Sequence, residues 1–203
     1  KRAVTVTIMR RKGEEGVRAR AAGVVGHLYL GIESGLDEVR GTMEKDHTLE
    51  QAYEQIQRLR AAGLIYDAHI MTGIAGRGRG LENAEATAEF FNRTRPERSI
   101  HFSLFLMAGT PPYEDAKAGR FFPASELENL EEERRLLQLM EWEGQRVVYD
   151  GFHDCITFRV RGRLPGEKEK MLGKLDGAIK VWKEKEPVFA WAERVPDAVI
   201  LKE

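Results

Sequence analysis

The sequence contains one cysteine, Cys155, among 203 residues. A single cysteine excludes an intrachain disulfide framework and any metal site built only of cysteines. The 32 basic and 33 acidic residues give a net charge of −1, so the chain lacks a field that attracts nucleic acid or an anionic membrane. No apolar run approaches the ~18 residues of a membrane span, and no signal-peptide core follows Lys1. We therefore expect a cytoplasmic protein with neither nucleic acid nor membrane as a partner.

Apolar residues make up 42% of the chain, which excludes a disordered protein. A length of 203 residues suits one domain with a sizeable core better than two domains. The sequence starts at Lys1 without a methionine and enters an apolar stretch at once. This start predicts that the sequence is cut from a longer protein.

Short apolar runs alternate with amphipathic helical patterns in the first half of the chain. Strands are expected where β-branched and other apolar residues cluster, at Ala3–Met9, His27–Ile32, Leu64–Thr72 and Ser99–Met107. Helices are expected between them, over Glu14–Val24, after Thr48, and over Leu81–Thr94. Thr48 and Gln51 form a capping-box pattern at the start of the second helix, and Gly63 suits its end.

This alternation predicts parallel β/α units with short connections. Four strands are fewer than the eight that usually close a barrel, so the predicted fold is α/β with an incomplete parallel β/α barrel. The glycines and polar residues follow the strands directly. They are therefore expected at the carboxyl edge of the sheet, where such sheets bind ligands.

The pattern changes after Arg120. Two charged helices are expected over Glu126–Glu143 and Glu167–Glu186, with short strands between them at Val147–Tyr149 and Ile156–Val160. Residues 1–122 are thus predicted to form the partial barrel, and residues 123–203 a C-terminal extension of charged helices and a short β segment. The three glutamates 131–133 are expected on a solvated helix face, paired with basic residues three and four positions away.

Three segments follow predicted strands and carry residues suited to a ligand: Gly31–Gly35 (GIESG), Gly73–Gly80 (GIAGRGRG) and Gly109–Glu114 (GTPPYE). They offer a carboxylate with a hydroxyl, backbone amides that glycines leave accessible to an anion or a flat base, and a rigid proline wall. Taken alone, the first and third segments are better explained as a strand-end turn and a loop exit, and the glycine segment is equally well explained as a flexible loop. Their order along one sheet edge favours a shared site.

Four segments resemble the second half of the radical S-adenosylmethionine (SAM) enzyme core: HLYLGIESG, HTLEQAYEQIQRLRAAG, IMTGIAGRGRG and LFLMAGTPPYEDAKAGRF. The resemblance runs from about Gly26 to Phe122. It implies a six-unit partial β/α barrel in which SAM lies across the carboxyl ends of the strands and its methionine chelates a 4Fe–4S cluster. Reductive cleavage of SAM would then give a 5′-deoxyadenosyl radical that abstracts hydrogen from a small-molecule substrate.

The resemblance also implies which residues bind SAM. Glu33 and Ser34 would lie at its ribose and methionine end, and the loop after the third predicted strand would present its backbone to adenine. Arg77 stands where that loop often has a glutamate. The complete implied set is Gly31, Glu33, Ser34, Met71, Gly73, Gly76, Leu106, Thr110 and Pro111.

The family's cluster motif, C-x-x-x-C-x-x-C, is absent from these residues, and Cys155 lies far downstream of its expected place. Three thiolates are the ligands that such a cluster needs. We therefore expect a C-terminal part of a radical SAM enzyme that binds no cluster and performs no radical chemistry by itself. No catalytic residue is assigned, and whether the chain alone is an enzyme stays open.

Two other functions fit the same residues. A cluster-free module could hold a nucleotide or phosphate through the amides of Gly73–Gly80 and through Arg77 or Arg79. A non-catalytic interaction domain could pair with a partner, or with a second copy, through an exposed first strand at Ala3–Met9.

A further group of reactive residue types lies in the predicted extension: Tyr149, Asp150, His153, Asp154 and Cys155. A structural role is favoured over contact with a substrate. A metal site from His153, Asp150 and Asp154 is least favoured, because their spacing needs a helix and Gly151 disfavours one. His69 and His101 are expected to be satisfied sheet residues, or else to face the barrel interior.

Overall fold

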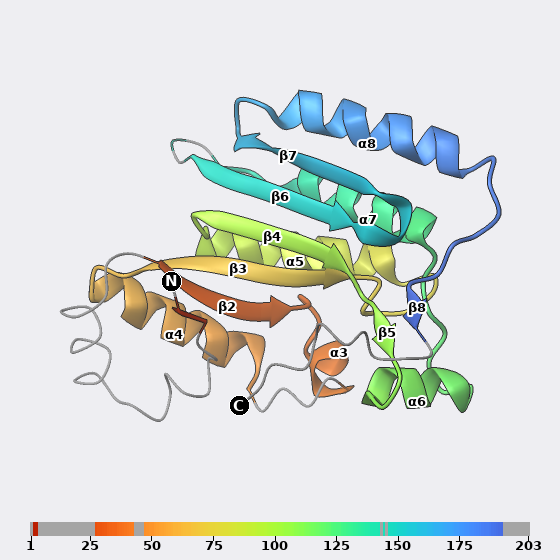
Figure 1. Ribbon diagram of the computed structural model, residues 1–203. Helices are drawn as coiled ribbons and strands as arrows, with labels where there is room; N and C mark the ends of the chain where they lie inside the picture. Colours follow the sequence, from red (N-terminus) through yellow and green to blue (C-terminus); the bar gives the residue numbers. More distant parts are fainter. Residues whose placement is uncertain (1, 4–26, 43–46, 143, 145, 193–203) are drawn as a thin grey trace.

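The computed structural model describes residues 2–3, 27–42, 47–142, 144 and 146–192 (Figure 1). Its main sheet has the strand order β1-β2-β3-β4-β6-β7. Neighbours from β1 to β6 pair in parallel, and β7 pairs antiparallel with β6. The strands are β1 Arg2–Ala3, β2 His27–Glu33, β3 Ile65–Thr72, β4 Arg98–Ser103, β6 Val147–His153 and β7 Phe158–Leu164.

Two short strands form a separate parallel pair, β5 Leu106–Met107 with β8 Trp191–Ala192. A 3₁₀ turn, Asp154–Ile156, connects β6 to β7. The α-helices are α3 Asp37–Thr42, α4 Leu49–Ala61, α5 Gly80–Thr94, α6 Pro111–Lys117, α7 Glu126–Leu139 and α8 Lys168–Trp182. None of the helices in the described ranges is long and apolar enough to cross a lipid bilayer.

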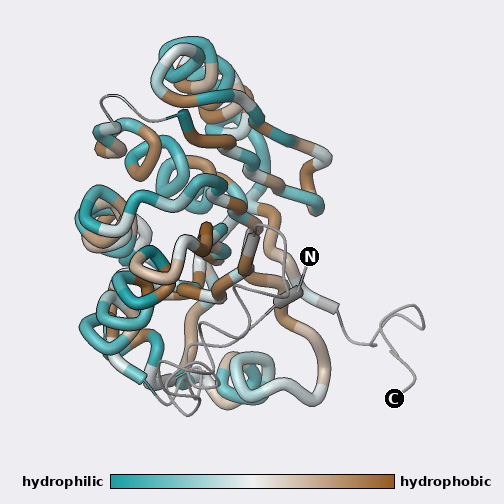
Figure 2. Tube along the Cα trace, turned by 90° about the vertical axis from the view of Figure 1, so that its left-hand side faces the viewer, coloured by the Kyte–Doolittle hydropathy of each residue, from teal (hydrophilic) through white to brown (hydrophobic). Residues whose placement is uncertain are grey.

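The long helices cover one face of the main sheet. Figure 2 looks along the strands and shows the helices stacked on one side. Buried side chains at alternate strand positions, such as Leu30 and Ile70, join Ile56 of α4 and Phe91 of α5 in one core. The positions between them face the other way, toward the viewer of Figure 1. We call this side the front face. The parallel, incomplete sheet agrees with the predicted fold class.

Local sequence signals begin and end α4 as predicted, and a similar signal begins α7. Thr48 caps α4: its hydroxyl accepts a hydrogen bond from the Gln51 amide at 3.2 Å, and its own amide donates to the Gln51 side chain at 3.2 Å. Gly63 has a φ of +73°, the left-handed conformation that glycine adopts without strain. Ser125 forms a second capping box at the start of α7.

The first predicted strand and helix lie largely outside the described residues. Of Ala3–Met9, the structure describes Ala3, which belongs to β1 and pairs with Tyr29 of β2. Among the described strands, β1 stands at the end of the sheet. The predicted helix Glu14–Val24 falls wholly outside the described part.

The C-terminal third contributes strands to the same sheet as the first half. The strands β6 and β7 are longer than predicted, and β6 lies directly beside β4 (Figure 1). Helix α7 ends at Leu139, before the predicted end at Glu143. The division into residues 1–122 and 123–203 stays a prediction.

The expectation that glutamates 131–133 form a solvated face is wrong for two of them. Glu132 and Glu133 are buried at 1% and 0% exposure, whereas Glu131 is half-exposed and pairs with Lys183. The physical reason is that α7 contacts α5, α8 and the sheet, so several of its faces are covered. Its carboxylates then accept hydrogen bonds from these elements instead of water.

Candidate functional site

The ends of β2, β3 and β4 lie at one edge of the sheet. Their parallel pairing brings together the turns that follow Glu33, Thr72 and Ser103. The amide of Leu104 donates to the carbonyl of Thr72 at 2.8 Å, which links the exits of β3 and β4 directly. The first two predicted motifs therefore lie at the carboxyl edge, where parallel sheets bind ligands. The predicted strand Ser99–Met107 is divided, because β4 ends at Ser103, and the third motif, Gly109–Glu114, follows β5 of the separate strand pair.

The turn after β2 is strained and tightly packed. Gly31 pairs with His69, and an irregularity in the register separates it from Glu33, whose φ is +65°. A non-glycine residue in this region marks a local backbone constraint. Ser34 is fully buried, and its hydroxyl donates to Oδ1 of Asn83 at 2.6 Å. The Ser34 hydroxyl thus holds this turn against α5.

The loop after β3 uses its backbone amides within the protein. Gly76 donates to the Gly73 carbonyl at 3.0 Å, and Arg77 donates to the Phe122 carbonyl at 2.8 Å. Gly78 donates to Oε1 of Glu128 at 2.9 Å. An anion cradle needs free amides, so this arrangement disfavours a phosphate site built from these groups.

The residues after β4 also have defined partners. Leu106 is buried in β5 beside Trp191, and Thr110 donates its hydroxyl to the Met107 carbonyl at 2.7 Å. Pro111 is the first residue of α6 and is exposed. Met71, from the preceding strand, is half-buried on the front face.

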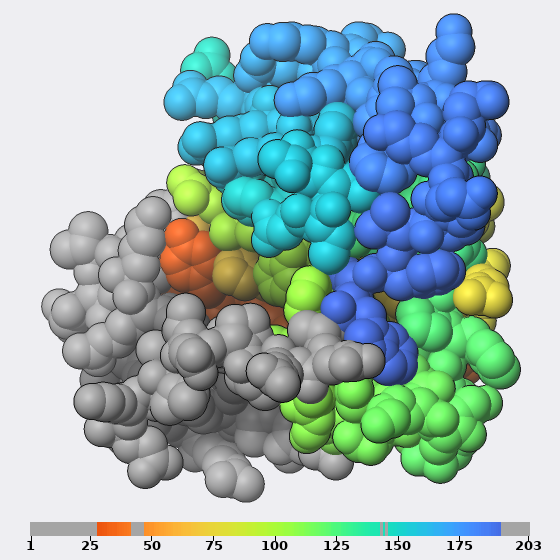
Figure 3. All heavy atoms as spheres, turned by 45° about the vertical axis from the view of Figure 1, so that its right-hand side comes forward, coloured from red at the N-terminus to blue at the C-terminus, as the bar shows by residue number. Residues whose placement is uncertain are grey.

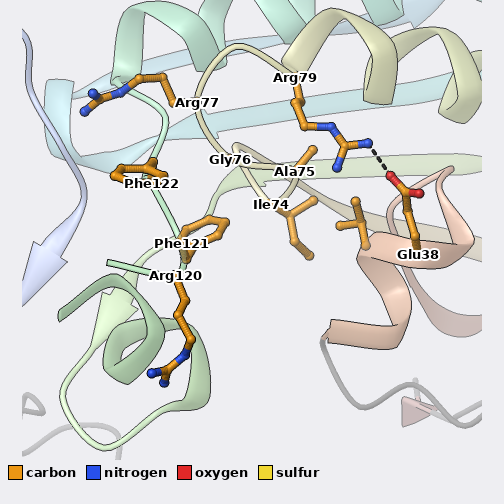
Figure 4. A pocket seen from close by; sticks show the side chains of 10 residues that line it. Glu38, Ile74, Ala75, Gly76, Arg77, Arg79, Arg120, Phe121 and Phe122 are labelled. Carbon is orange, nitrogen blue, oxygen red and sulfur yellow. Dashed lines mark hydrogen bonds and ion pairs between the residues drawn. The ribbon is translucent and has the colours of Figure 1, made fainter. Parts of the chain in front are cut away.

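A pocket of about 320 Å³ opens beside the loop after β3 (Figure 4). Its walls come from α3, from the loop itself and from the segment after α6. Ile74 and Phe121 lie on opposite sides of the space in Figure 4, while Arg77 and Arg120 point away from it. The lining residues are Glu38, Val39, Ile74, Ala75, Gly76, Arg77, Arg79, Arg120, Phe121 and Phe122.

Of the nine residues predicted to bind SAM, Gly76 lines this pocket. It has a φ of +82°, and a Cβ there would lie 3.1 Å from the Phe122 carbonyl oxygen and 3.2 Å from the Phe121 ring. Sequence reasoning missed Val39, Phe121 and Phe122 as lining residues. The two adjacent phenylalanines after a turn were a usable signal in the sequence, because exposed aromatic rings often mark binding surfaces. In the structure, 61% of Phe122 is exposed.

The arginines around the pocket have acidic or aromatic neighbours. Arg79 pairs with Glu38 and, at 2.9 Å, with Glu82, and these hydrogen bonds raise its pKa above the ordinary value. Arg77 lies 5.7 Å from the centre of the Phe189 ring. The charge of Arg79 is thus balanced by two glutamates, and Ile74, Phe121 and Phe122 supply the apolar part of the pocket walls.

A buried set of hydrogen bonds, the Glu132 network, lies behind the turns. Oε2 of Glu132 accepts from the Gly73 amide at 2.8 Å, and Oε1 accepts from Nδ2 of Asn83 at 2.7 Å. Asn83 in turn accepts from Ser34. Burial raises the pKa of Glu132 to about 8, although these hydrogen bonds act in the opposite direction.

A second buried set, the His153 network, joins the end of β6 to α7. Nδ1 of His153 lies 3.0 Å from Oε2 of Glu126, and Nε2 lies 2.8 Å from Oε2 of Glu133. The Tyr149 hydroxyl donates to Glu133 at 3.0 Å, and the Ser103 hydroxyl donates to Glu126 at 2.9 Å. Burial alone would lower the pKa of His153, but the two carboxylates raise it to about 9.

The raised pKa of His153 predicts a pH-dependent stability. Because folded His153 binds its proton more tightly than unfolded His153 does, this proton stabilises the folded state. The contribution is complete below pH 6.5, the ordinary pKa, and is lost as the pH rises through about 9. The raised pKa of Glu132 also makes the folded state less stable as the pH rises, because the buried carboxyl group favours its protonated form. The melting temperature should therefore fall between pH 6.5 and pH 9, as scanning calorimetry would measure. The His153→Gln variant should show a shallower fall, and an identical slope would contradict the assignment.

The other polar residues near the end of β6 lie outside the His153 network. Asp150 accepts two hydrogen bonds from Arg159, at 2.8 and 2.7 Å, while Asp154 and Cys155 are exposed. Within the described ranges, no group of three or more histidine, cysteine, aspartate or glutamate residues is arranged to hold a metal ion. Partial desolvation of the thiol, together with the nearby carboxylates of Glu126 and Asp154, raises the pKa of Cys155.

The two strand histidines differ. His101 is buried, lies 2.6 Å from the Ser99 hydroxyl, and has its pKa lowered by burial to about 4. His69 is half-buried on the front face, between the rings of Tyr29 and Phe102 at 5.2 and 6.1 Å. Its Nε2 is buried without a hydrogen-bond partner. His101 is thus a satisfied sheet residue as expected, whereas Nε2 of His69 is not satisfied.

A scan against protein-family models found no match. Among curated proteins, the chain is similar to the tRNA-2-methylthio-N(6)-dimethylallyladenosine synthase of Cereibacter sphaeroides, with 26% identity over 155 residues, or 74% of this chain and 33% of the relative. The synthase of Alkalilimnicola ehrlichii is 27% identical over 137 residues, or 63% and 30%. The chain therefore spans about a third of the length of these relatives.

Among solved structures, the chain is similar to the archaeal Elp3 of Methanocaldococcus infernus with an N-terminal deletion. The superposition has a TM-score of 0.58 and 21% sequence identity, and it covers 68% of this chain and 32% of that one. At this identity the likeness shows the fold alone. It agrees with the incomplete parallel sheet described above.

Proposed function

The chain is related to the radical SAM enzymes, the superfamily of these relatives, and we propose that it carries part of the SAM-binding site of such an enzyme. In this proposal the whole enzyme uses SAM with a 4Fe–4S cluster, forms a 5′-deoxyadenosyl radical and acts on a small molecule in the cytoplasm. The 203 residues alone are not catalytically competent.

The observation that carries the proposal is the pocket at the carboxyl edge. Ile74, Phe121 and Phe122 supply apolar surface of the kind that a flat purine contacts, and Gly76 lets the backbone approach closely. A volume of about 320 Å³ lies at the small end of ligand pockets. The residues therefore fit the adenosine part of SAM, whose positive sulfonium would extend toward the turn that holds Glu33.

The residues do not fit the cluster. One cysteine, Cys155, cannot supply three thiolate ligands, and it lies on the turn between β6 and β7, outside the residues that line the pocket. The cluster ligands of the proposed enzyme are thus not among these residues.

The front face is the proposed location of the small-molecule substrate. Cross-strand neighbours place His69 beside Ile100, and Ile100 beside Asp150. Figure 3 shows part of this face at the surface, below the β6–β7 hairpin. Burial lowers the pKa of His69, with Glu33 and Asp67 acting in the opposite direction. A neutral imidazole there can donate or accept a hydrogen bond.

The phosphate-binding alternative has weaker support. The amides of Gly73, Gly76, Arg77 and Gly78 already donate within the protein, and Arg79 is paired with two carboxylates. Equilibrium dialysis with labelled SAM and with labelled ATP separates the two functions. We expect the chain to retain SAM and to release ATP. Equal binding of both would favour the nucleotide module.

Replacing Gly76 by alanine should weaken SAM binding about tenfold or more, because the methyl group would meet Phe122 and the Phe121 ring. Gly78→Ala is the matched control. Gly78 has a similar φ of +76°, but a Cβ there would meet nothing within 4 Å. Both variants place alanine at a similar positive φ and carry similar backbone strain. They differ in that only the Gly76→Ala methyl group contacts the residues of the pocket wall. Dialysis measures the affinities, and equal affinities in the two variants would remove this pocket as the SAM site.

The third possibility, an interaction domain that pairs through its first strand, stays a prediction. Among the described strands, β1 has one neighbour, β2, and an end strand of this kind is what such pairing would use. Sedimentation at increasing protein concentration would detect self-association, which the fragment proposal does not require.

A further inference from the structure

Two turns of the candidate site are joined through a single carboxylate of α7. Glu132 accepts the amide proton of Gly73, which follows β3, and a side-chain proton of Asn83 on α5. The other end of the Asn83 amide accepts the hydroxyl proton of Ser34, which follows β2. The three hydrogen bonds measure 2.8, 2.7 and 2.6 Å. They form an unbroken chain from one turn to the other.

We propose that Glu132 is a positioning residue of the cofactor site, which fixes the turn after β2 relative to the glycine loop after β3 through Asn83. The expected effect of Glu132 on SAM binding rests on the proposed function, whereas the coupling of the two turns does not. It gives Ser34 and Gly73 an indirect part in binding: their own polar groups hold the two turns in place instead of touching the ligand.

The glycine loop rests on α7 at both of its ends. A Cβ on Gly73 would lie 2.4 Å from Oδ1 of Asn129, and a Cβ on Gly80 would lie 3.0 Å from Oε2 of Glu132. Between them, the Gly78 amide donates to Glu128, one helical turn before Glu132. One face of α7 is thus the platform on which the loop is built.

The neighbouring glutamates of α7 do not share this role. Glu131 pairs with Lys183 of the segment after α8 at 3.2 Å, and Glu133 belongs to the His153 network. Glu132 alone of these three bonds to both α5 and the loop after β3. Its carboxylate suits the task because two acceptor atoms at a fixed separation can hold two donors from different elements.

The test compares Glu132→Ala with Glu131→Ala as the matched control, by amide hydrogen exchange and by SAM dialysis of the full chain. We expect residues 33–36 and 73–80 to exchange about tenfold faster together in Glu132→Ala, with SAM affinity about tenfold lower. Glu131→Ala should leave both measurements near the wild-type values.

Two further variants distinguish positioning from general support. Glu132→Gln should recover most of the affinity, because its amide can accept from Gly73 and donate to a rotated Asn83. Asn83→Ala cuts the chain of bonds at a different point. It should speed exchange in residues 33–36, leave Gly73 protected and still weaken SAM binding, and it carries the test if Glu132→Ala fails to fold.

Several outcomes would overturn the inference. Faster exchange of only one turn in Glu132→Ala shows that the two turns are not coupled. Unchanged SAM affinity with both turns released shows that their coupling does not position the site. If the wild-type chain binds no SAM, the proposed function fails instead, and the exchange measurements still decide whether Glu132 couples the two turns.

Discussion

Replacing Gly35 by alanine should lower the free energy of unfolding by about 3 kcal/mol or more. An added Cβ would lie 2.2 Å from the backbone nitrogen of Thr87 and 2.4 Å from the carbonyl carbon of Ala86, both on α5. A backbone cannot rotate aside as a side chain does, so the turn after β2 and α5 would have to separate. That movement would also break the 2.9 Å hydrogen bond from the Gly35 amide to the Thr87 hydroxyl.

Urea denaturation of Gly35→Ala measures this loss, and Gly41→Ala is its control. Gly41 lies on α3, where a Cβ would meet nothing within 4 Å, and alanine favours a helix over glycine by about 1 kcal/mol. The control should therefore be as stable as the wild type or slightly more so. A Gly35→Ala protein of wild-type stability would show that α5 does not lie against this turn as described.

Replacing His153 by alanine should cost about 3–5 kcal/mol at neutral pH, because it leaves buried carboxylates without their shared partner. Glu126 and Glu133 are both 0% exposed, and each accepts from one ring nitrogen of His153. With the imidazole removed, Tyr149 and Ser103 remain as their hydrogen-bond donors. Two neutral hydroxyls do not balance two buried negative charges.

A second substitution separates the charge effect from the loss of ring packing. Adding Glu133→Gln to His153→Ala should recover part of the stability, since it removes one uncompensated charge. His69→Ala is the control for removing an imidazole, and it should cost about 1 kcal/mol or less because its Nε2 makes no hydrogen bond. If the double variant is less stable than His153→Ala, the buried ion pairs are not the source of the stability.

Much of the fold follows from local patterns in the sequence. The strand and helix periodicities locate β2, β3, β4, α4 and α5 to within a few residues, because each element buries one face at its own period. The capping box at Thr48 and the left-handed Gly63 are decided by a few neighbouring residues. Parallel order then follows from short connections, and it places the turns after β2 and β3 at one edge.

Burial of charge was not predictable in the same way. A helical pattern identifies Leu130 and Leu137 as inward, but it assigns Glu132 and Glu133 to water, because it contains no partners from other elements. Their partners, Asn83, Gly73 and His153, lie far away in the sequence. Tertiary hydrogen bonds therefore outweighed the solvation preference of the side chains.

The pocket was predictable in place but not in composition. The sequence located the glycine loop with Gly76, yet the apolar wall comes from Phe121 and Phe122 after α6. The amide of Arg77 joins the two segments by donating to the Phe122 carbonyl. Such a contact between loops depends on how α6 returns to the sheet, which no local pattern determines.

The pairing of β4 with β6 has a consequence for biosynthesis. A ribosome releases the chain from its N-terminal end, and the residues of α6 and α7 emerge before β6 does. Until Val147–His153 has left the exit tunnel, β4 has one edge without its final neighbour, and such an edge can associate with other nascent chains. The interval in which β6 is still being translated is thus when chaperones would protect this protein most.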